Sequence, residues 1–385
     1  MQTRSIEVFR DSATVCESVR QFQTRNGVGY QIKMRVLPYL YGFVYLAPLD
    51  DCEWLLIDSG CGDDDAFADL ESAFRAIREE FDSSFAPERI RCICLTHAHI
   101  DHFGGVHELK RRTNAEVAVH ALESRLVERY DEVARVENCR YTYFLLESGV
   151  PSELVESVLD GFGFRPGRAK HTPVDRILYG GETIGPLQTV YLPGHSPGHL
   201  AYLCGDIIFS GDLLLSKTCS QIWPERMTPK TGVLTYVRSL LKLKQIALDY
   251  EKRNCKKLVA LPSHEEPIFN IPERVDKALR LMERRNSRLL KIFDEAETPS
   301  TLWEISPRMY WSGRPHREFF ALSDIASRVE LFQQFNLLKI ANPESLSYSN
   351  HAIRYSRSLS NAEAAKNTIK QVVSMQLTCD EPDLI

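Results

Sequence analysis

The sequence predicts a layered α/β fold built around a sheet. Short apolar runs bounded by Gly, Pro or Asp alternate with longer segments in which apolar residues recur every three or four positions. This mixed order of strands and helices is typical of layered α/β architectures. With 385 residues and 43% hydrophobic content, the chain can bury a large core, as one large domain with an appendage or as two domains.

The first third of the sequence predicts strands, then strands alternating with helices. The expected elements are strands over 31–37, 41–47, 53–57, 91–95 and 115–119, and helices over 63–80 and 106–112. In the longer helix Phe67, Leu70 and Phe74 share one face. Cys92 and Cys94 share one face of a buried strand, and this position favours core packing over a metal motif.

Residues 122–165 interrupt the strands with a polar, helical insertion. The break at Gly149-Val150-Pro151-Ser152 predicts the end of one helix and the start of another. We expect the insertion to form a lid, because it separates two histidine-containing segments of the chain. Its apolar residues are compatible either with an acyl pocket or with a small core of the insertion itself; they are Tyr141, Tyr143, Phe144 and Leu145.

The second half of the sequence returns to strands and then becomes helical. The expected elements are strands over 176–179, 187–192, 201–204, 206–210 and 258–261, and helices over 232–251 and 272–293, with Gly205 as the pivot of a hairpin. Residues 298–341 are predicted to be helical with a short terminal strand. The composition predicts a loose polar tail over 346–385, with one weak helix over 362–373.

The composition argues against several classes of function. The formal net charge of −5 gives no basic surplus for binding phosphate backbones or anionic membranes. Residues 1–21 lack the apolar core of a signal peptide, and no window is apolar enough to span a bilayer. Most of the ten cysteines lie in or beside apolar runs, as buried thiols do. These features predict a protein of the reduced cytoplasm with no membrane partner.

Four potential metal ligands follow the predicted buried strand over 91–95. They lie in the run Thr96-His97-Ala98-His99-Ile100-Asp101-His102. Neutral imidazole and carboxylate are ligands that suit zinc and neighbouring divalent metals, and a loop at the end of a strand can direct alternate side chains toward one point. A non-repetitive chain offers few structural reasons for such a run, so it predicts a metal site.

Later segments repeat one design, in which an apolar strand ends near Gly or Pro and a potential ligand follows. His195 follows Leu192-Pro193-Gly194, Asp212 follows Ser210-Gly211, and His264 follows Pro262-Ser263. Asp58, in Ile57-Asp58-Ser59-Gly60, has a similar position after an earlier strand. Glycine allows a sharp turn without a Cβ clash, so the next side chain can point into a cleft at the sheet edge.

The HxHxDH run resembles the signature of the metallo-β-lactamase superfamily, and the other four motifs occur in the order found there. The resemblance covers about residues 31–293. It implies an αββα sandwich over 1–296, with the helical insertion inside it. A small C-terminal helical domain over 297–345 resembles the winged-helix-like tail of a lactamase-beta-2-like branch.

The resemblance also implies a role for each site residue. His97, His99 and His195 would hold one metal ion, Asp101, His102 and His264 a second, and Asp212 would bridge both. Asp58 would support a ligand imidazole without binding metal itself, and His199 would either do the same or donate to the leaving group. Zinc is the expected metal, with iron or manganese as alternatives. Two cations about 3.5 to 4 Å apart would generate a bridging hydroxide, with Asp101 and Asp212 as the catalytic carboxylates.

The substrate class is a further expectation from the resemblance. The complete second metal set and the absence of an export signal argue against antibiotic hydrolysis, and the segment 213–263 leaves no room for a nucleic-acid clamp domain. The compact layout resembles glyoxalase II, lactonases and acyl-thioesterases, which favours an ester, thioester or lactone of a small molecule. A phosphodiesterase or endoribonuclease of the lactamase-beta-2-like type is the alternative. A regulatory binding protein without turnover is a third, which the complete ligand set disfavours.

Two segments near the C-terminal side leave their roles open. The helix over 322–334 carries one basic residue, Arg328, beside Asp324 and Glu330, which favours a packing module or a homodimer contact over a nucleic-acid face. Trp223 and its neighbours Arg226 and Lys230 either meet an anionic substrate group or lie in a solvated loop, and the loop is favoured. The expected partner is therefore a small-molecule substrate.

Overall fold

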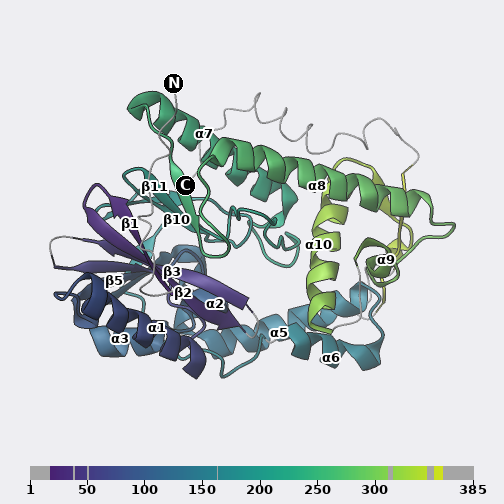
Figure 1. The fold of residues 1–385 in the computed structure, drawn as a ribbon. Coiled ribbons are helices and arrows are strands. Elements are labelled where there is room, and N and C mark those ends of the chain that lie inside the picture. The colour runs from purple at the N-terminus through teal and green to yellow at the C-terminus, as the bar shows by residue number, and fades with distance from the viewer. Residues whose placement is uncertain are drawn as a thin grey trace.

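The computed structural model describes residues 18–37, 40–49, 52–162, 164–310, 315–344 and 351–358. Two sheets lie face to face with helices on their outer sides, which confirms the predicted α/β sandwich (Figure 1). The core between the sheets holds aromatic and aliphatic side chains of both. Tyr45 of one sheet meets Phe209 of the other with ring centroids 5.1 Å apart, and Phe22 meets Phe209 at 5.8 Å.

The first sheet has seven strands in sequence order. They are β1 (Val19–Thr24), β2 (Gly27–Leu37), β3 (Leu40–Pro48), β4 (Trp54–Ile57), β5 (Ile90–Cys94), β6 (Glu116–His120) and β7 (Arg176–Leu178). The pairs from β1 to β4 are antiparallel, and those from β4 to β7 are parallel. Parallel pairing requires crossovers, which α1 (Asp64–Ala76) and α3 (Val106–Thr113) supply. The carboxyl ends of β4 and β5 therefore lie side by side.

The second sheet has five strands in the order β12-β11-β10-β9-β8. They are β8 (Thr183–Ile184), β9 (Leu187–Tyr191), β10 (Leu200–Cys204), β11 (Ile207–Gly211) and β12 (Val259–Pro262). Gly205 has φ +62° between β10 and β11, as expected of the hairpin pivot. β11 and β12 are parallel, so their carboxyl ends are neighbours too. The long helices α7 (Gly232–Asn254) and α8 (Ile271–Asp294) pack against each other and share a core with this sheet.

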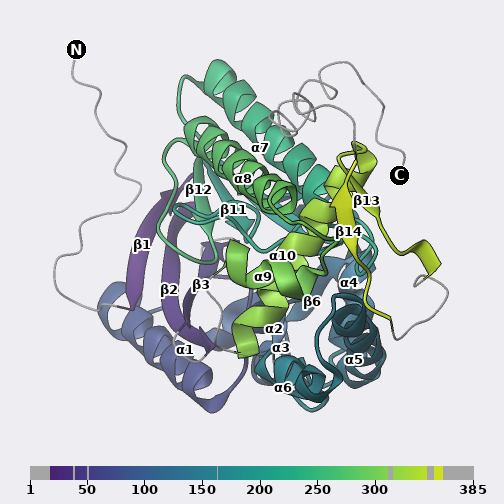
Figure 2. The same ribbon diagram turned by 90° about the vertical axis from the view of Figure 1, so that its right-hand side faces the viewer.

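The insertion packs with the C-terminal helices instead of forming a core by itself. It consists of α4 (Ala121–Glu128), α5 (Tyr130–Glu147) and α6 (Ser152–Phe162). Figures 1 and 2 show α5 and α6 beside α9 (Leu302–Met309) and α10 (Pro315–Gln334). Phe144 and Leu145 are buried in this shared core, Tyr141 contacts Phe319 at 5.1 Å, and Tyr143 is exposed. Neither expectation for these four residues holds, because helices far along the chain cover Tyr141, Phe144 and Leu145, and Tyr143 faces outward.

Several boundaries differ from the predicted ones. β1 and the short strand β8 were not predicted, and α1 ends at Ala76, followed by a π-helical turn over Ile77–Phe81. β14 (Tyr355–Arg357) pairs antiparallel with β13 (Leu338–Ile340), inside the segment expected to be a loose tail. Tyr355 is buried in the C-terminal core, and that contact orders a strand too short to show a pattern. The predicted helix over 362–373 lies outside the described residues.

Cys92 and Cys94 belong to the core between the sheets, as their positions predicted. Their Sγ atoms are 3.8 Å apart, and both side chains are buried. Among the helices in the described part of the chain, none combines the length and the apolar composition that crossing a bilayer requires.

A buried arginine of α10, paired with an aspartate of the same helix, links α10 to α8. The Arg328 side chain is 1% exposed, and it donates to both oxygens of Asp324 at 2.9 and 3.0 Å and to Asn286 Oδ1 at 2.6 Å. Burial opposes both charges, but the Arg328 guanidinium holds the pKa of Asp324 below its usual value. The only basic residue of the predicted helix over 322–334 is thus engaged in the core and unavailable to a nucleic acid.

Removing one charge of this pair should destabilise the fold more than removing both. In Asp324→Asn the buried Arg328 loses its counter-charge, and a broken buried pair typically costs about 3–5 kcal/mol. Urea unfolding should show that loss, and the double variant Asp324→Leu with Arg328→Met should recover most of it. A free energy of unfolding in Asp324→Asn equal to that of the wild type would contradict the assignment.

Candidate metal centre

The predicted ligands come together where strands of both sheets end. Asp58 follows β4, and the run His97–His102 follows β5, with Asp101 and His102 in the short helix α2 (Ile100–Phe103). His195 lies between β9 and β10, and Asp212 and His264 follow the parallel strands β11 and β12. Parallel strands bring their carboxyl ends to one edge, so residues far apart in the sequence meet there.

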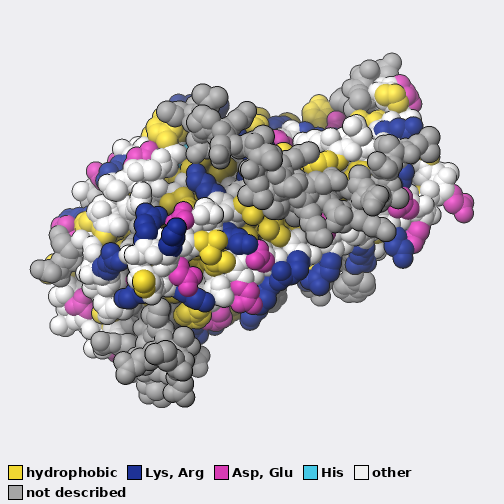
Figure 3. Space-filling view, turned by 90° about the horizontal axis from the view of Figure 1, so that it is seen from above, with side chains coloured by type: hydrophobic (Ala, Val, Ile, Leu, Met, Phe, Trp, Pro, Cys, Tyr) yellow, Lys and Arg dark blue, Asp and Glu magenta, His cyan; other side chains and the backbone are white. Residues whose placement is uncertain are grey.

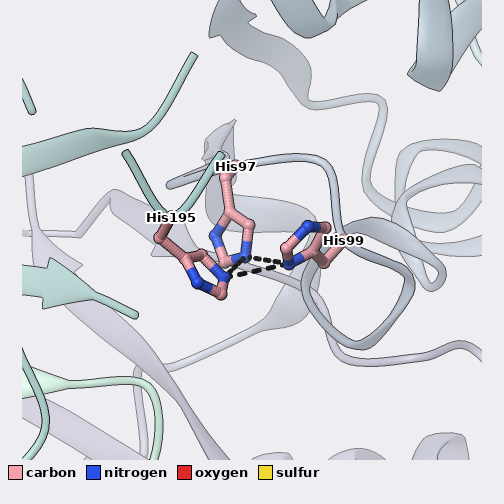
Figure 4. A group of neighbouring side chains, drawn as sticks. All are labelled: His97, His99 and His195. Atoms are coloured by element: carbon pink, nitrogen blue, oxygen red, sulfur yellow. Dashed lines mark hydrogen bonds between the residues drawn. The ribbon is translucent and has the colours of Figure 1, made fainter. Parts of the chain in front are cut away.

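Three imidazole rings converge on one point (Figure 4). His97 Nε2 lies 3.0 Å from His99 Nδ1 and 3.2 Å from His195 Nε2, and His195 Nε2 lies 3.0 Å from His99 Nδ1. Zinc ligands in a tetrahedral site, with Zn–N of about 2.0–2.1 Å, would be roughly 3.3 Å apart. The three nitrogens are therefore spaced closely enough to share a single cation.

A second group of ligands lies beside the first, and Asp212 stands between them. His264 Nε2 is 3.2 Å from Asp101 Oδ2, and His102 Nε2 is 3.6 Å from the same oxygen. Asp212 Oδ2 lies 3.6 Å from the Nε2 atoms of His102 and His264 and 3.7 Å from His195 Nε2. One carboxylate oxygen thus faces ligands of both groups.

Hydrogen bonds on the outer side of three imidazoles fix their tautomers. Nδ1 of His102 is 2.9 Å from Asp58 Oδ2, Nδ1 of His195 is 2.9 Å from the Gln221 carbonyl, and Nδ1 of His264 is 3.1 Å from the Tyr41 carbonyl. These oxygens only accept, so Nδ1 carries the proton. In the neutral ring the Nε2 lone pair then faces the centre, which is the arrangement of metal-binding histidines.

The polar atoms that face the centre fit a divalent cation. His102 Nε2 and Asp212 Oδ1 are buried and have no hydrogen-bond partner among the described residues. Neutral imidazoles there would direct their lone pairs at the carboxylates and repel them, and a buried polar atom without a partner is costly. A cation among these atoms removes both penalties, and the mixed nitrogen and oxygen donors suit zinc, iron or manganese.

The charges of the site divide it into two halves. In the three-imidazole half, burial and the neighbouring rings lower the pKa of His97 and His195, and burial together with His195 lowers the pKa of His99 to about 3. These rings are therefore neutral, the form that binds metals. In the other half burial opposes charge, but Asp212 and Asp101 outweigh it and raise the pKa of His264 to about 9. The carboxylates make this half attractive to a cation.

Asp58 joins three segments beneath the centre. It is fully buried, with φ +60°, and accepts the Thr96 amide at 2.7 Å and the Ser263 hydroxyl at 3.0 Å, besides facing His102. The contact with His102 is the one that the predicted supporting role requires. A Cβ on nearby Gly211, which has φ +52°, would lie 2.7 Å from His199 Nε2, so the turn before Asp212 requires glycine.

His199 contacts the backbone of Asp212. Its ring is fully buried, and its Nε2 accepts the amide of Asp212 at 3.1 Å. Of the two roles left open by the sequence, this contact favours support of the site over donation to a leaving group.

Several supporting residues gave no signal in the sequence. Three buried tyrosines donate to backbone carbonyls beside the ligands: Tyr202 to Leu95 at 2.7 Å, Tyr45 to Pro262 at 2.5 Å and Tyr236 to Leu213 at 2.6 Å. The buried carboxylate of Glu123 accepts amides of both histidine loops. The one sequence feature that could have indicated these supporting residues is a polar side chain within an apolar run. Such side chains are common in protein cores, so the feature does not single these residues out.

The segment after Asp212 is buried at Trp223, contrary to the favoured expectation of a solvated loop, whereas Arg226 and Lys230 are exposed as that expectation requires. Trp223 is 8% exposed and its ring lies 6.3 Å from that of His99. Arg226 pairs with Glu147 at 3.2 Å and stacks on Phe144, so its charge is already engaged. The helices α6 and α10, distant in sequence, bury Trp223 through Phe162 and Phe319.

Loss of Asp58 as an acceptor should weaken metal binding. In Asp58→Asn the acceptor facing His102 Nδ1 becomes an amide, and such outer partners typically account for about 10–100-fold in metal affinity. Asp175→Asn is the matched control, because Asp175 also accepts a backbone amide, that of Val117, but touches no ligand. Competition with a chromophoric chelator measures the effect; equal affinities in the two variants would refute the supporting role.

Comparisons with known proteins identify the family and support the fold. The sequence model of the metallo-beta-lactamase superfamily matches residues 39–253, more than half of the chain. Among solved structures, a metallo-beta-lactamase family protein from Thermus thermophilus superposes with a TM-score of 0.64 at 23% identity, over 86% of this chain and 98% of that one. A beta-lactamase domain protein from Burkholderia ambifaria gives 0.71 at 19% identity, over 91% and 98%. At these identities the two structures support the fold alone.

Curated relatives match parts of the chain. The probable metallo-hydrolase YqgX of Bacillus subtilis (strain 168) is 31% identical over 129 residues, which are 32% of this chain and 48% of that protein. The hydroxyacylglutathione hydrolase of Buchnera aphidicola subsp. Schizaphis graminum is 24% identical over 213 residues, 54% of this chain and 62% of the relative. The chain thus spans about half to three fifths of the length of these relatives.

Proposed function

The chain belongs to the metallo-beta-lactamase superfamily, and from that membership we propose that it is a dinuclear metal-dependent hydrolase of a small thioester, ester or lactone. One observation carries the proposal: Asp212 Oδ2 lies 3.6–3.7 Å from ligand nitrogens of both histidine groups. A carboxylate in that position is suited to bridge two ions. Zinc is the expected metal, and iron or manganese would suit the same donors.

Seven residues of the centre would bind the metal ions, and one of them would also accept a proton. His97, His99 and His195 would hold one ion and His102, His264 and Asp101 the other, with Asp212 shared. Divalent ions bound there would polarise a substrate carbonyl and acidify a water molecule enough to attack it at neutral pH. Asp101 and Asp212 are 14% and 12% exposed at their side chains, against 1% for Asp58. They would be the carboxylates within reach of substrate, and Asp101 would orient the attacking water and take its proton.

One observation supports a thioester as the substrate, and a second supports an apolar acyl part. The hydroxyacylglutathione hydrolases among the relatives are named for thioester cleavage. Beside His99, Trp223 continues into an aromatic cluster: it contacts Phe162 at 5.6 Å and Phe320 at 6.0 Å. Phe320, on α10, remains 38% exposed. We propose that this surface, Trp223 with Phe162 and Phe320, receives the acyl group.

Truncation of the exposed ring should weaken substrate binding more than the chemical step. Phe320→Ala removes apolar area that a bound acyl group would cover, and roughly 1.5 kcal/mol of lost burial corresponds to a KM about tenfold higher for long acyl thioesters. Short acyl groups should be little affected. Leu248→Ala, a similar truncation of a partly exposed side chain on α7, is the control. An unchanged KM across chain lengths in Phe320→Ala would exclude this surface as the acyl site.

A substrate panel tests the function directly. Acyl-CoA, acyl-glutathione, homoserine lactone, bis-nitrophenyl phosphate and single-stranded RNA should be assayed with and without chelator. We expect chelator-sensitive cleavage of the acyl substrates, lost in His97→Ala and Asp212→Ala while the proteins stay folded. A metal-loaded protein inactive on every substrate would instead favour the regulatory binding protein.

One feature favours the second candidate, a phosphodiesterase or endoribonuclease. Five exposed basic residues follow one face of α8: Lys277, Arg280, Arg284, Arg288 and Lys291. Figure 3 looks at the side of the molecule that carries α8 and shows Lys and Arg side chains in a row along one edge. Their spacing of three or four residues keeps them on one face, where a phosphate backbone can lie. Lys277 also pairs with Glu273 at 2.6 Å, which reduces the free charge of the row.

Charge reversal on α8 separates the two candidates. Arg280→Glu with Arg284→Glu should leave thioester hydrolysis unchanged, because neither residue contacts the centre. If RNA is the substrate, the same variant should lose cleavage and show a shallower dependence of binding on salt concentration. RNA cleavage that is both chelator-sensitive and lost in this variant would replace the thioesterase proposal.

A further inference from the structure

Glu123 occupies a position between the two loops that carry the three converging imidazoles. It lies in the first turn of α4, directly after His120, which ends β6 and caps the helix. One carboxylate oxygen, Oε2, accepts the backbone amide of Ala98, and the other, Oε1, accepts that of Gly198 at 2.9 Å. Ala98 separates His97 from His99, and Gly198 belongs to the loop of His195. A single carboxylate therefore binds both loops by their backbones.

The contact between Glu123 and the two loops is buried and close. Glu123 is 4% exposed, and within the described part of the chain no Lys or Arg forms an ion pair with it. A Cβ on Gly198 would lie 2.8 Å from Glu123 Cγ and 2.9 Å from His120 Cβ, so the loop approaches this closely only because residue 198 is glycine. A buried carboxylate without a basic side chain beside it requires another source of positive potential.

We propose that Glu123 is a positioning residue for the three-imidazole half of the metal centre. It holds the His97–His99 loop and the His195 loop at the separation at which their ring nitrogens meet at 3.0–3.2 Å. Its charge also offsets part of the charge of the cation, because the ligands of that half, His97, His99 and His195, are neutral imidazoles. The inference rests on the proposed metal centre, but it does not depend on which bond the protein cleaves.

The chemistry of the two contacts explains why a carboxylate is required. Both partners are N–H donors, so both side-chain oxygens must accept. Glutamine has the same length but one acceptor, and its NH2 group would face an amide N–H. Aspartate has two acceptors but is one methylene shorter. Glu123→Gln therefore tests whether the charge and the second acceptor are needed, and Glu123→Asp tests whether the length of the side chain is needed.

The test measures metal binding and ligand geometry without a substrate. Wild-type, Glu123→Gln and Glu123→Asp proteins are stripped of metal, then titrated with zinc against a chromophoric chelator and with cobalt(II) followed by its visible absorption. We expect Glu123→Gln to bind zinc about 10–100-fold more weakly and to alter the cobalt bands, with Glu123→Asp in between. Glu182→Gln is the matched control, because Glu182 accepts the amides of Tyr179 and Gly180, each at 2.8 Å, in a loop without ligands.

The outcomes distinguish this inference from the proposed function. Wild-type zinc affinity and an unchanged cobalt spectrum in Glu123→Gln would overturn the positioning role, even if thermal unfolding of the metal-free variant showed lower stability. Should Glu123→Gln fail to fold, wild-type affinity in Glu123→Asp would overturn it as well. A wild-type protein that binds no metal would instead overturn the proposed function.

Discussion

The structure depends on buried imidazoles and carboxylates that converge on one point and require positive charge among them, from ring protons or from a metal ion. The Nε2 atoms of His102, His195 and His264 are held toward two carboxylates by hydrogen bonds on the outer side of each ring. Leaving such atoms without a partner in the interior costs folding free energy. We therefore expect metal binding to stabilise this edge of the sandwich, because an ion would satisfy the atoms that these contacts hold together.

The two sheets make this convergence possible. The parallel pairs β4–β5 and β11–β12 bring the carboxyl ends of four strands to one edge, and the interlocking aromatic core holds the sheets in register. Tyrosine hydroxyls then anchor the chain just before or after the ligands, as Tyr45 does at Pro262. Glu123 adds a link between two loops that belong to different sheets. Support from several independent elements explains how one site can be built from residues as far apart in the sequence as His97 and His264.

What the sequence could predict depended on how local the signal was. The HxHxDH run and the Gly- or Pro-flanked strand ends predicted which ligands would meet, because each motif lies within a few residues. The role of Glu123, the tyrosine anchors and the burial of Trp223 arise from packing between segments that are far apart in the sequence, as Glu123 and Gly198 are. The same reason accounts for β14, whose three residues are ordered by Tyr355 entering a distant core. The helical insertion was found, but its partner, α10, could not be inferred from its own pattern.

The most direct test of the account is an anomalous-scattering crystal structure of the protein with the metal it carries from expression. The account predicts two anomalous peaks about 3.5 to 4 Å apart, one surrounded by His97, His99 and His195 and the other by Asp101, His102 and His264, with Asp212 bound to both. A single peak, or peaks elsewhere in the molecule with Asp212 free of metal, would contradict it.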